Sequence, residues 1–133
     1  AQMSYGFGTR VQAPFADVLA QVRQALADNG FGVITEIDLA KTLHDKIGAD
    51  VPDQVILGAC SPAHAYRAIQ AEPSIGLLLP CNVVVRSDGS ETIVDVIDPQ
   101  MMVKLSDSPS MCAVADEIEG KLRATVAAVN AAF

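Results

Sequence analysis

Two cysteines occupy positions that favour reaction or ligand contact. Cys60 immediately precedes Ser61-Pro62, a pair that is typical of a helix start. Free amide groups and the helix dipole at such a position favour the thiolate, the nucleophilic form of cysteine. Cys81 lies in an apolar stretch, which has the opposite tendency. The alternative for either residue is packing, because cysteine is also a small buried hydrophobe.

The two thiols form one site if residues 58–60 and 79–81 belong to neighbouring strands. They could then join in a disulfide or share a ligand. Cys112, in the first turn of a predicted last helix, is assigned to packing. Three cysteines are an odd number in a chain with an adequate core, which argues against a secreted disulfide framework. We therefore expect a reducing compartment and a cytoplasmic protein.

A second candidate group is built from histidine and methionine side chains. His64 follows Cys60 by four residues, and residues with that spacing at a helix start can lie close together. Met101 and Met102 offer soft thioether contacts to a ligand, although methionine more often fills gaps in a core. The sequence contains no CxxC, HExxH or HxH pattern, so no metal site is predicted.

Carboxylates on or beside the predicted strands complete the set of candidates. Glu36, Asp38, Asp95 and Asp98 could act as general acids or bases if buried. Their alternative roles are structural: Asp38 as the cap of a following helix, and Asp98, before Pro99, as a turn residue. No glycine-rich phosphate loop and no Ser-His-Asp signature with a nucleophile elbow is visible, which disfavours conventional nucleotide and acyl-transfer enzymes.

Composition restricts the class of protein further. The 133 residues are 50% hydrophobic and 19% charged, as expected of a globular domain. A formal net charge of −7 opposes binding to a phosphate backbone, so nucleic acid is excluded as a partner. No basic cluster or basic amphipathic helix suggests a membrane partner.

The N-terminus leaves two expectations open. The chain begins Ala1-Gln2-Met3, and no apolar signal core precedes the first predicted strand. Met3 is then the natural start, or Ala1 is a processed N-terminus, in which case the protein is periplasmic.

The first half of the chain must position these residues with two strands and two helices. Residues 4–12 and 31–39 read as strands, and in the second of them Val33 and Ile37 are expected to share a face. A helix opens at Pro14 and ends at Asn29-Gly30, both expected in the left-handed region. A short helix over residues 39–47 follows the second strand.

The second half predicts three further strands, over residues 54–59, 75–85 and 92–97. It also predicts two further helices, one from Ser61 to near Glu72 and one from Met111 onward. The 75–85 stretch is the most apolar, and it is predicted to be a central strand with Cys81 in its middle. The turn at 87–90 makes a hairpin with the next strand, and residues 106–110 read as a linker. We predict a single domain over residues 1–133, of α+β class, with a mostly antiparallel sheet and helices packed on one side.

Several phrases of the sequence together resemble one family. They are Gly30-Phe31-Gly32-Val33 running into Glu36-Ile37-Asp38, Gly58-Ala59-Cys60-Ser61-Pro62, Gly76-Leu77-Leu78-Leu79-Pro80-Cys81-Asn82-Val83 and Asp98-Pro99. Together they are similar to the domain-of-unknown-function 302 family, from about Tyr5 to the C-terminal helix.

The resemblance implies a compact α+β domain with a layout like that of the TATA-binding protein, and homodimers. It implies no established activity. The positions that match the family are Asp38, Cys60, Pro62, Pro80, Cys81, Asn82, Asp98 and Pro99, with Lys41 as a secondary candidate. Met101 and Met102 are both candidates for the apolar residue after the Asp-Pro phrase.

Three hypotheses for function follow. In the first, an acidic, soluble homodimer binds a small or apolar ligand, with haem among the candidates, in a cleft between the sheet and the C-terminal helix. Its ligand-binding residues would be Cys60, Cys81, Asn82, Asp38, Asp98, His64, Met101 and Met102. In the second, a thiol-based redox enzyme or sulfur carrier uses Cys60 and Cys81. In the third, the chain is a dimerisation or interaction module without chemistry.

Overall fold

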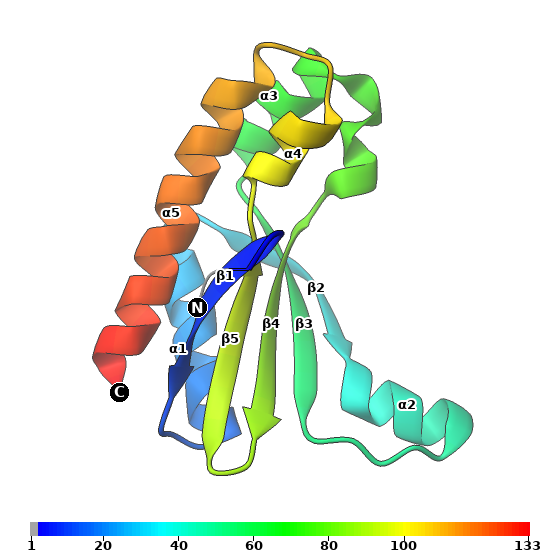
Figure 1. The fold of residues 1–133 in the computed structure, drawn as a ribbon, viewed down its shortest axis with the longest axis vertical. Helices are drawn as coiled ribbons and strands as arrows, with labels where there is room; N and C mark the ends of the chain where they lie inside the picture. The colour runs from blue at the N-terminus through cyan, green and yellow to red at the C-terminus, as the bar shows by residue number, and fades with distance from the viewer. Residues whose placement is uncertain (1–2) are drawn as a thin grey trace.

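The fold is built on one antiparallel sheet of five strands in the order β1-β5-β4-β3-β2 (Figure 1). The computed structural model describes residues 3–133, so Ala1 and Gln2, on which the N-terminal prediction depends, lie outside the described residues. The strands are β1 (Gly6–Val11), β2 (Gly32–Asp38), β3 (Gln54–Cys60), β4 (Cys81–Asp88) and β5 (Glu91–Ile97).

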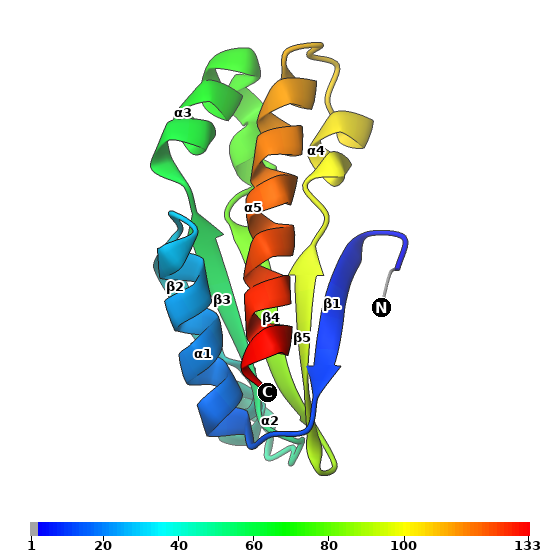
Figure 2. The ribbon, with the colours of Figure 1, turned by 90° about the vertical axis from the view of Figure 1, so that its left-hand side faces the viewer.

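Helices cover one face of the sheet and extend it at one end. They are α1 (Phe15–Asp28), α2 (Leu39–Ile47), α3 (Pro62–Ala71), the 3₁₀ helix η1 (Pro73–Leu78), α4 (Gln100–Leu105) and α5 (Met111–Ala132). Figure 2 shows α1 and α5 side by side on the same face of the sheet. Helices α3 and α4 lie beyond one end of the strands, whereas α2 projects at the other end (Figure 1). The predicted α+β class and antiparallel sheet are confirmed.

Side-chain alternation along the strands produces the core. Leu57 in β3 pairs with Val83 in β4, and both are fully buried beneath the helices. The apolar stripes of α1 and α5 meet this face through Leu26 and Leu122, which are also inaccessible to solvent. Burial of such side chains provides the main driving force of folding, roughly 1.5–3 kcal/mol for each large one. No helix within residues 3–133 has both the length and the apolar character needed to cross a membrane.

The local turn and cap signals are confirmed where they depend on neighbouring residues. Asp38 caps α2, because its Oδ1 accepts a hydrogen bond from the Lys41 amide at 3.0 Å. The β4–β5 hairpin turns at Gly89, whose φ of 63° lies in the left-handed region that glycine enters at little cost. At the end of α1 only Gly30 is left-handed, with φ 82°, whereas Asn29 has φ −101°, so the prediction for Asn29 was wrong.

The predicted central strand over residues 75–85 is also wrong in its first half. Residues Pro73–Leu78 form η1, and β4 begins only at Cys81, which is therefore at the start of the strand and not in its middle. Pro73 occupies the first turn of η1, where its missing N–H costs no hydrogen bond. Pro80 likewise cannot donate to a strand ladder, so pairing begins after it.

Helix α4 was not expected, and one face assignment in β2 fails. A bulge at Ile34 shifts the register, so that Val33 pairs with Ala59 whereas Ile37 pairs with Ile56. The partners Ala59 and Ile56 are three residues apart on β3 and therefore point to opposite faces. Val33 and Ile37 consequently do not share a face. The extra residue of a bulge leaves the ladder and re-aims its side chain, which frees Ile34 for the site described below.

Candidate functional site

The sheet, α3, η1 and α5 enclose a pocket of about 310 Å³ at the end of the strands where β3 finishes and β4 begins. We call it the thiol pocket. Its lining residues are Phe31, Ile34, Ala59, Cys60, Ser61, Ala65, Ile69, Gly76, Leu79, Pro80, Cys81 and Ile118. Only Ser61 and the two cysteines bring polar side-chain atoms to this lining. The pocket therefore suits an apolar molecule.

The floor of the thiol pocket is rigid and its rim is open. Phe31, Ala59 and Ile118 are at most 4% exposed and belong to the core. Ile34, released by the bulge in β2, and Ile69 on α3 are 61% and 46% exposed. An apolar molecule could thus enter past exposed apolar side chains and rest on a preformed base.

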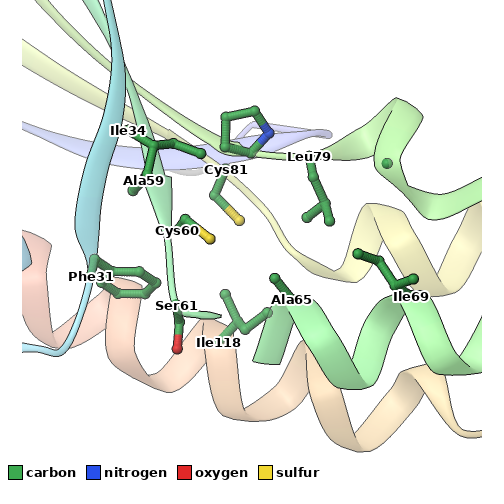
Figure 3. Close-up of a pocket in the computed structure, with 12 residues that line it drawn as sticks. Phe31, Ile34, Ala59, Cys60, Ser61, Ala65, Ile69, Leu79, Cys81 and Ile118 are labelled. Atoms are coloured by element: carbon green, nitrogen blue, oxygen red, sulfur yellow. The ribbon is translucent and has the colours of Figure 1, made fainter. Parts of the chain in front are cut away.

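Strand pairing brings the two thiols together. Ala59 pairs with Cys81 across β3 and β4, so Cys60 lies beside the same strand end. Figure 3 shows both sulfur atoms directed into the same space of the thiol pocket. All three cysteines are free, with Cys60 partly exposed, Cys81 buried and Cys112 exposed. The condition that the sequence left open is met for residues 58–60 in β3 and for Cys81 at the start of β4, whereas Leu79 and Pro80 precede the strand.

The two thiols of the pocket differ in their environment. Burial raises the pKa of the Cys81 thiol to about 11, and the nearby Cys60 adds to the shift. Cys81 is therefore protonated at neutral pH. Cys60 occupies the end of β3 before the helix α3, as its sequence position predicted.

Gly58 allows the wall of the thiol pocket to form. A Cβ at this position would lie 2.0 Å from Thr35 Oγ1 and 2.6 Å from Pro80 Cγ. Both distances are shorter than real contacts, so only glycine lets β2 and the segment before Cys81 approach β3 so closely.

A hydrogen-bonded chain of four side chains lies behind the pocket rim and joins α3 to α5. Ser61 Oγ lies 2.7 Å from His64 Nδ1, and His64 Nε2 lies 3.2 Å from Glu117 Oε1. Arg67 donates to both oxygens of Glu117, at 2.9 and 3.0 Å. We call this chain the serine relay. Cys60 is not part of it, because His64 pairs with Ser61 instead.

The direction of each hydrogen bond in the serine relay follows from the charge of Glu117. Hydrogen bonds from Arg67 and then from His64 lower the pKa of Glu117 to about 2. An ionised carboxylate can only accept, so His64 Nε2 must carry the hydrogen. In the neutral imidazole Nδ1 is then the acceptor, and the Ser61 hydroxyl donates to it.

A second cavity, of about 240 Å³, lies on the other side of the segment that precedes β4. Its lining residues are Leu77, Leu78, Leu79, Pro80, Cys81, Asn82, Ile97, Asp98, Pro99, Met101 and Met102. Leu79, Pro80 and Cys81 line both spaces and thus form a shared wall. Asp98 is already engaged as a turn residue, since its Oδ1 accepts from the Gln100 amide at 2.9 Å.

With this geometry in hand, the chain can be compared with known proteins. The profile of the domain of unknown function DUF302 matches residues 7–129. The chain belongs to the DUF302 family. A crystal structure of an uncharacterized conserved DUF302 protein from Bacillus stearothermophilus is similar to it, with a TM-score of 0.88 and 24% sequence identity. The alignment covers 96% of this chain and 99% of that chain and shows a common fold. No curated protein matches the chain.

Most residues of the DUF302 phrases meet around the shared wall. Cys60 and Cys81 line the thiol pocket. Cys81 also lines the second cavity. The further phrase residues that line this cavity are Pro80, Asn82, Asp98 and Pro99, together with Met101 and Met102. Asp38 and Lys41 line neither space: Asp38 caps α2, and Lys41 Nζ pairs with Asp45 at 2.6 Å.

The predicted haem ligands do not form a suitable set in this DUF302 domain. Both ring nitrogens of His64 are engaged, by Ser61 and Glu117, and His64 lines neither cavity. Met102 is 3% exposed and lines the second cavity, whereas Cys60 lines the thiol pocket. His64 and Met102 are therefore not assembled with Cys60 around one site. Residues 3–133 also contain no group of three or more His, Cys, Asp or Glu side chains that could hold a metal ion.

Three features of the site escaped the sequence analysis. These are the roles of Glu117 and Arg67, the partnership of Ser61 with His64, and the apolar lining from Ile34 and Ile118. The spacing of Ser61 and His64 at a helix start was a usable signal, because residues three apart on a helix are neighbours. Nothing local links Glu117 to His64, which precedes it by 53 residues.

The lowered pKa of Glu117 gives a prediction about stability and pH. The folded-state value of about 2 lies below the ordinary value of 4.5, so the ionised carboxylate stabilises the fold above about pH 4.5. This contribution disappears as the pH falls toward 2. We expect Glu117→Gln to lower the melting temperature at neutral pH, and the deficit relative to the wild type to shrink on acidification.

Thermal unfolding of both proteins between neutral and acid pH measures this deficit. The matched control is Asp107→Asn, because Asp107 is exposed and its carboxylate is in no ion pair of residues 3–133. It should show no comparable dependence on pH. A deficit for Glu117→Gln that grows as the pH falls would contradict the assignment.

Proposed function

We propose that this chain binds a small apolar molecule in the thiol pocket. The observation that carries the proposal is the lining: a space of about 310 Å³ in which only Ser61, Cys60 and Cys81 offer polar side-chain atoms. Pockets of roughly 300–1,000 Å³ with a mainly apolar lining and a few placed polar groups are typical of ligand sites. The position between the strand ends and α5 agrees with the cleft expected from the sequence.

A variant that fills the pocket tests the proposal. Ala65 lines the pocket from α3, so the phenyl ring of Ala65→Phe would occupy ligand space. Gly76→Val is a second filling variant, because Gly76 lines the pocket and a Cβ there meets nothing within 4 Å. Ala63→Phe is the matched control, since Ala63 lies on the same helix but is exposed and lines no described pocket.

The probe is the neutral apolar fluorophore N-phenyl-1-naphthylamine, titrated against each protein. We expect Ala65→Phe and Gly76→Val to weaken its binding by at least about tenfold, which corresponds to about 1.4 kcal/mol. Ala63→Phe should bind it like the wild type. Equal affinity for all four proteins, or no binding by the wild type, would remove the proposal.

A second candidate function uses the thiols themselves, and the shared position of Cys60 and Cys81 supports it. A partly exposed thiol beside a buried protonated one is the arrangement of an attacking and a resolving cysteine. In this function Cys60 would attack a disulfide and release one of its two thiols, and Cys81 would then attack the mixed disulfide, release the second thiol and leave a disulfide between Cys60 and Cys81. Slow alkylation of Cys81 is the expected sign of its buried, protonated state.

The homodimer implied by the family resemblance and the cytoplasmic location stay predictions. The arm formed by β2 and α2 supports a contact with a second copy. Ile37, Ile47 and Val51 on or beside it are 47%, 74% and 42% exposed, and α2 contains no buried residue. Association with a second copy would bury the exposed apolar side chains of this edge strand and helix. The particle mass in solution tests the dimer.

A further inference from the structure

We propose that Ser61, His64 and Glu117 form a hydrolytic triad that cleaves small esters whose apolar acyl group occupies the thiol pocket. The inference rests on the proposed apolar site, because that site supplies the binding of the acyl group. It adds an activity that the pocket alone does not imply. The observations that carry it are the three-residue chain of hydrogen bonds and the place of Ser61 in the lining.

The serine relay has the polarity that a serine nucleophile requires. Glu117 holds the hydrogen of the neutral His64 ring on Nε2, which leaves the Nδ1 lone pair facing the Ser61 hydroxyl at 2.7 Å. A base within hydrogen-bond reach that is itself oriented by a carboxylate is the general signature of an activated nucleophile. His64 is only 9% exposed, so water competes little for its nitrogens.

Arg67 and the packing of α5 on α3 fix the carboxylate of Glu117. Arg67 donates to both of its oxygens, and Oε1 also accepts from His64. The carboxylate is therefore held by three hydrogen bonds, which would break if it rotated away. Glu117 and Arg67 are positioning residues, since they act on the reaction through His64.

Ser61 is free to react because it does not cap α3. Its side chain makes no hydrogen bond to the backbone of the helix that follows, although it occupies the N-cap position. Within the described chain, no side chain accepts from the amide groups of Ala63 and His64 in the first turn. Such amides carry the positive end of the helix dipole and could stabilise a developing oxyanion.

The position of the hydroxyl places the reaction at the rim of the pocket. Figure 3 shows the oxygen of Ser61 directed away from the two sulfur atoms. The carbonyl of an ester would therefore sit beside Ser61, while its acyl chain extends over the apolar floor formed by Phe31 and Ile118. A volume of about 310 Å³ favours a short acyl chain over a long one.

The chemical steps need only the ester and water. Ser61 Oγ bonds to the carbonyl carbon while its proton moves to His64 Nδ1. The bond from that carbon to the leaving oxygen then breaks, and the alcohol leaves with the proton from Nδ1. Water next attacks the acyl-serine and gives its proton to Nδ1, which returns it to Ser61 Oγ as the acid leaves. The sum is ester plus water giving acid plus alcohol, with no change of oxidation state.

The test is hydrolysis of p-nitrophenyl butyrate by the full chain and its variants. We expect Ser61→Ala to lower kcat/KM by at least about 100-fold, because the nucleophile is lost and only binding and oxyanion stabilisation are left. The matched control Ser74→Ala alters an exposed serine outside the pocket and should leave the rate unchanged. Tandem mass spectrometry of the acylated peptide separates an acyl group on Ser61 from one on Cys60.

Kinetics of Glu117→Gln distinguish a role in the reaction from a purely structural role of Glu117. It should lower kcat by about tenfold or more with little change in KM, and it should shift the pH–rate profile, because the imidazolium loses its carboxylate partner. A fluorophosphonate should label the wild type on the peptide that contains Ser61. Labelling of another residue would overturn the assignment.

The outcomes separate this inference from the proposed function. If Ser61→Ala binds N-phenyl-1-naphthylamine and hydrolyses the ester at the wild-type rate, the triad is wrong and the pocket stands. Absence of hydrolysis by the wild type, or an acyl group found on Cys60 and none on Ser61, would also overturn the triad. If the wild type binds no probe, the apolar site itself fails, whatever the rate of hydrolysis.

Discussion

Cys81 should be alkylated by iodoacetamide at least about 20-fold more slowly than a free cysteine derivative at pH 8. With its pKa raised to about 11, about one Cys81 thiol in a thousand is ionised at that pH. A free thiol with a pKa of about 8.5 is roughly one quarter ionised, which gives a difference of roughly 200-fold. The greater intrinsic nucleophilicity of the more basic thiolate recovers about tenfold. The remaining factor is about 20, and burial of the side chain increases it.

The pH dependence of the alkylation rate tests whether the slow reaction of Cys81 is due to its low ionised fraction. Between pH 8 and 10 the ionised fraction of Cys81 rises by roughly 90-fold, whereas that of a free thiol rises only about fourfold. Peptide mass spectrometry after timed alkylation follows Cys81 and the exposed Cys112 in the same sample. If Cys81 reacts as fast as Cys112 at pH 8, its role as the protonated partner of Cys60 is excluded. The thiol function then loses its main support.

Replacement of Leu57 by alanine is expected to lower the free energy of unfolding by about 3 kcal/mol. Leu57 is fully buried in β3, between β2 and β4, and belongs to the main core. Removing a buried leucine side chain costs the transfer free energy of the lost atoms and leaves a cavity, together about 2–5 kcal/mol. A domain of this size is stable by about 5–15 kcal/mol, so a large part of the total would be lost.

Urea unfolding of the two proteins measures this difference, with the midpoint and slope fitted together. Leu77→Ala is the matched control, because it removes the same atoms from a side chain that is 89% exposed. It should change the free energy of unfolding by no more than about 0.5 kcal/mol. A similar loss in both variants would contradict the assignment of Leu57 to the core that supports the strand ends of the thiol pocket.

The α+β class and all five strands were predictable because their signals are local. The run of β-branched residues over 92–97 and the glycine at the hairpin turn are signals carried by a few neighbouring positions. The same holds for Asp38, whose carboxylate caps a helix three residues further on. Such interactions are encoded within one turn or one strand.

The sequence could not assign the apolar run that begins at Ile75. An unbroken apolar stretch is equally compatible with a buried strand and with a buried helical turn. Ile75 is 1% exposed within η1, whereas its neighbours Leu77 and Leu78 face outward. Packing of η1 against α3 decided between the two, and this contact leaves the strand to begin at Cys81.

The sequence by itself determined which residues were candidates, and the tertiary structure decided which of them share a site. Residue type and spacing identified Cys60, Cys81 and His64 as chemically capable. Only the pairing of β3 with β4 placed the two thiols in one pocket, and only the packing of α5 on α3 gave His64 a carboxylate partner in Glu117. The reason is physical: caps, turns and side-chain alternation depend on near neighbours, whereas a pocket forms where distant segments bury a common apolar surface, and no local pattern specifies which segments will meet.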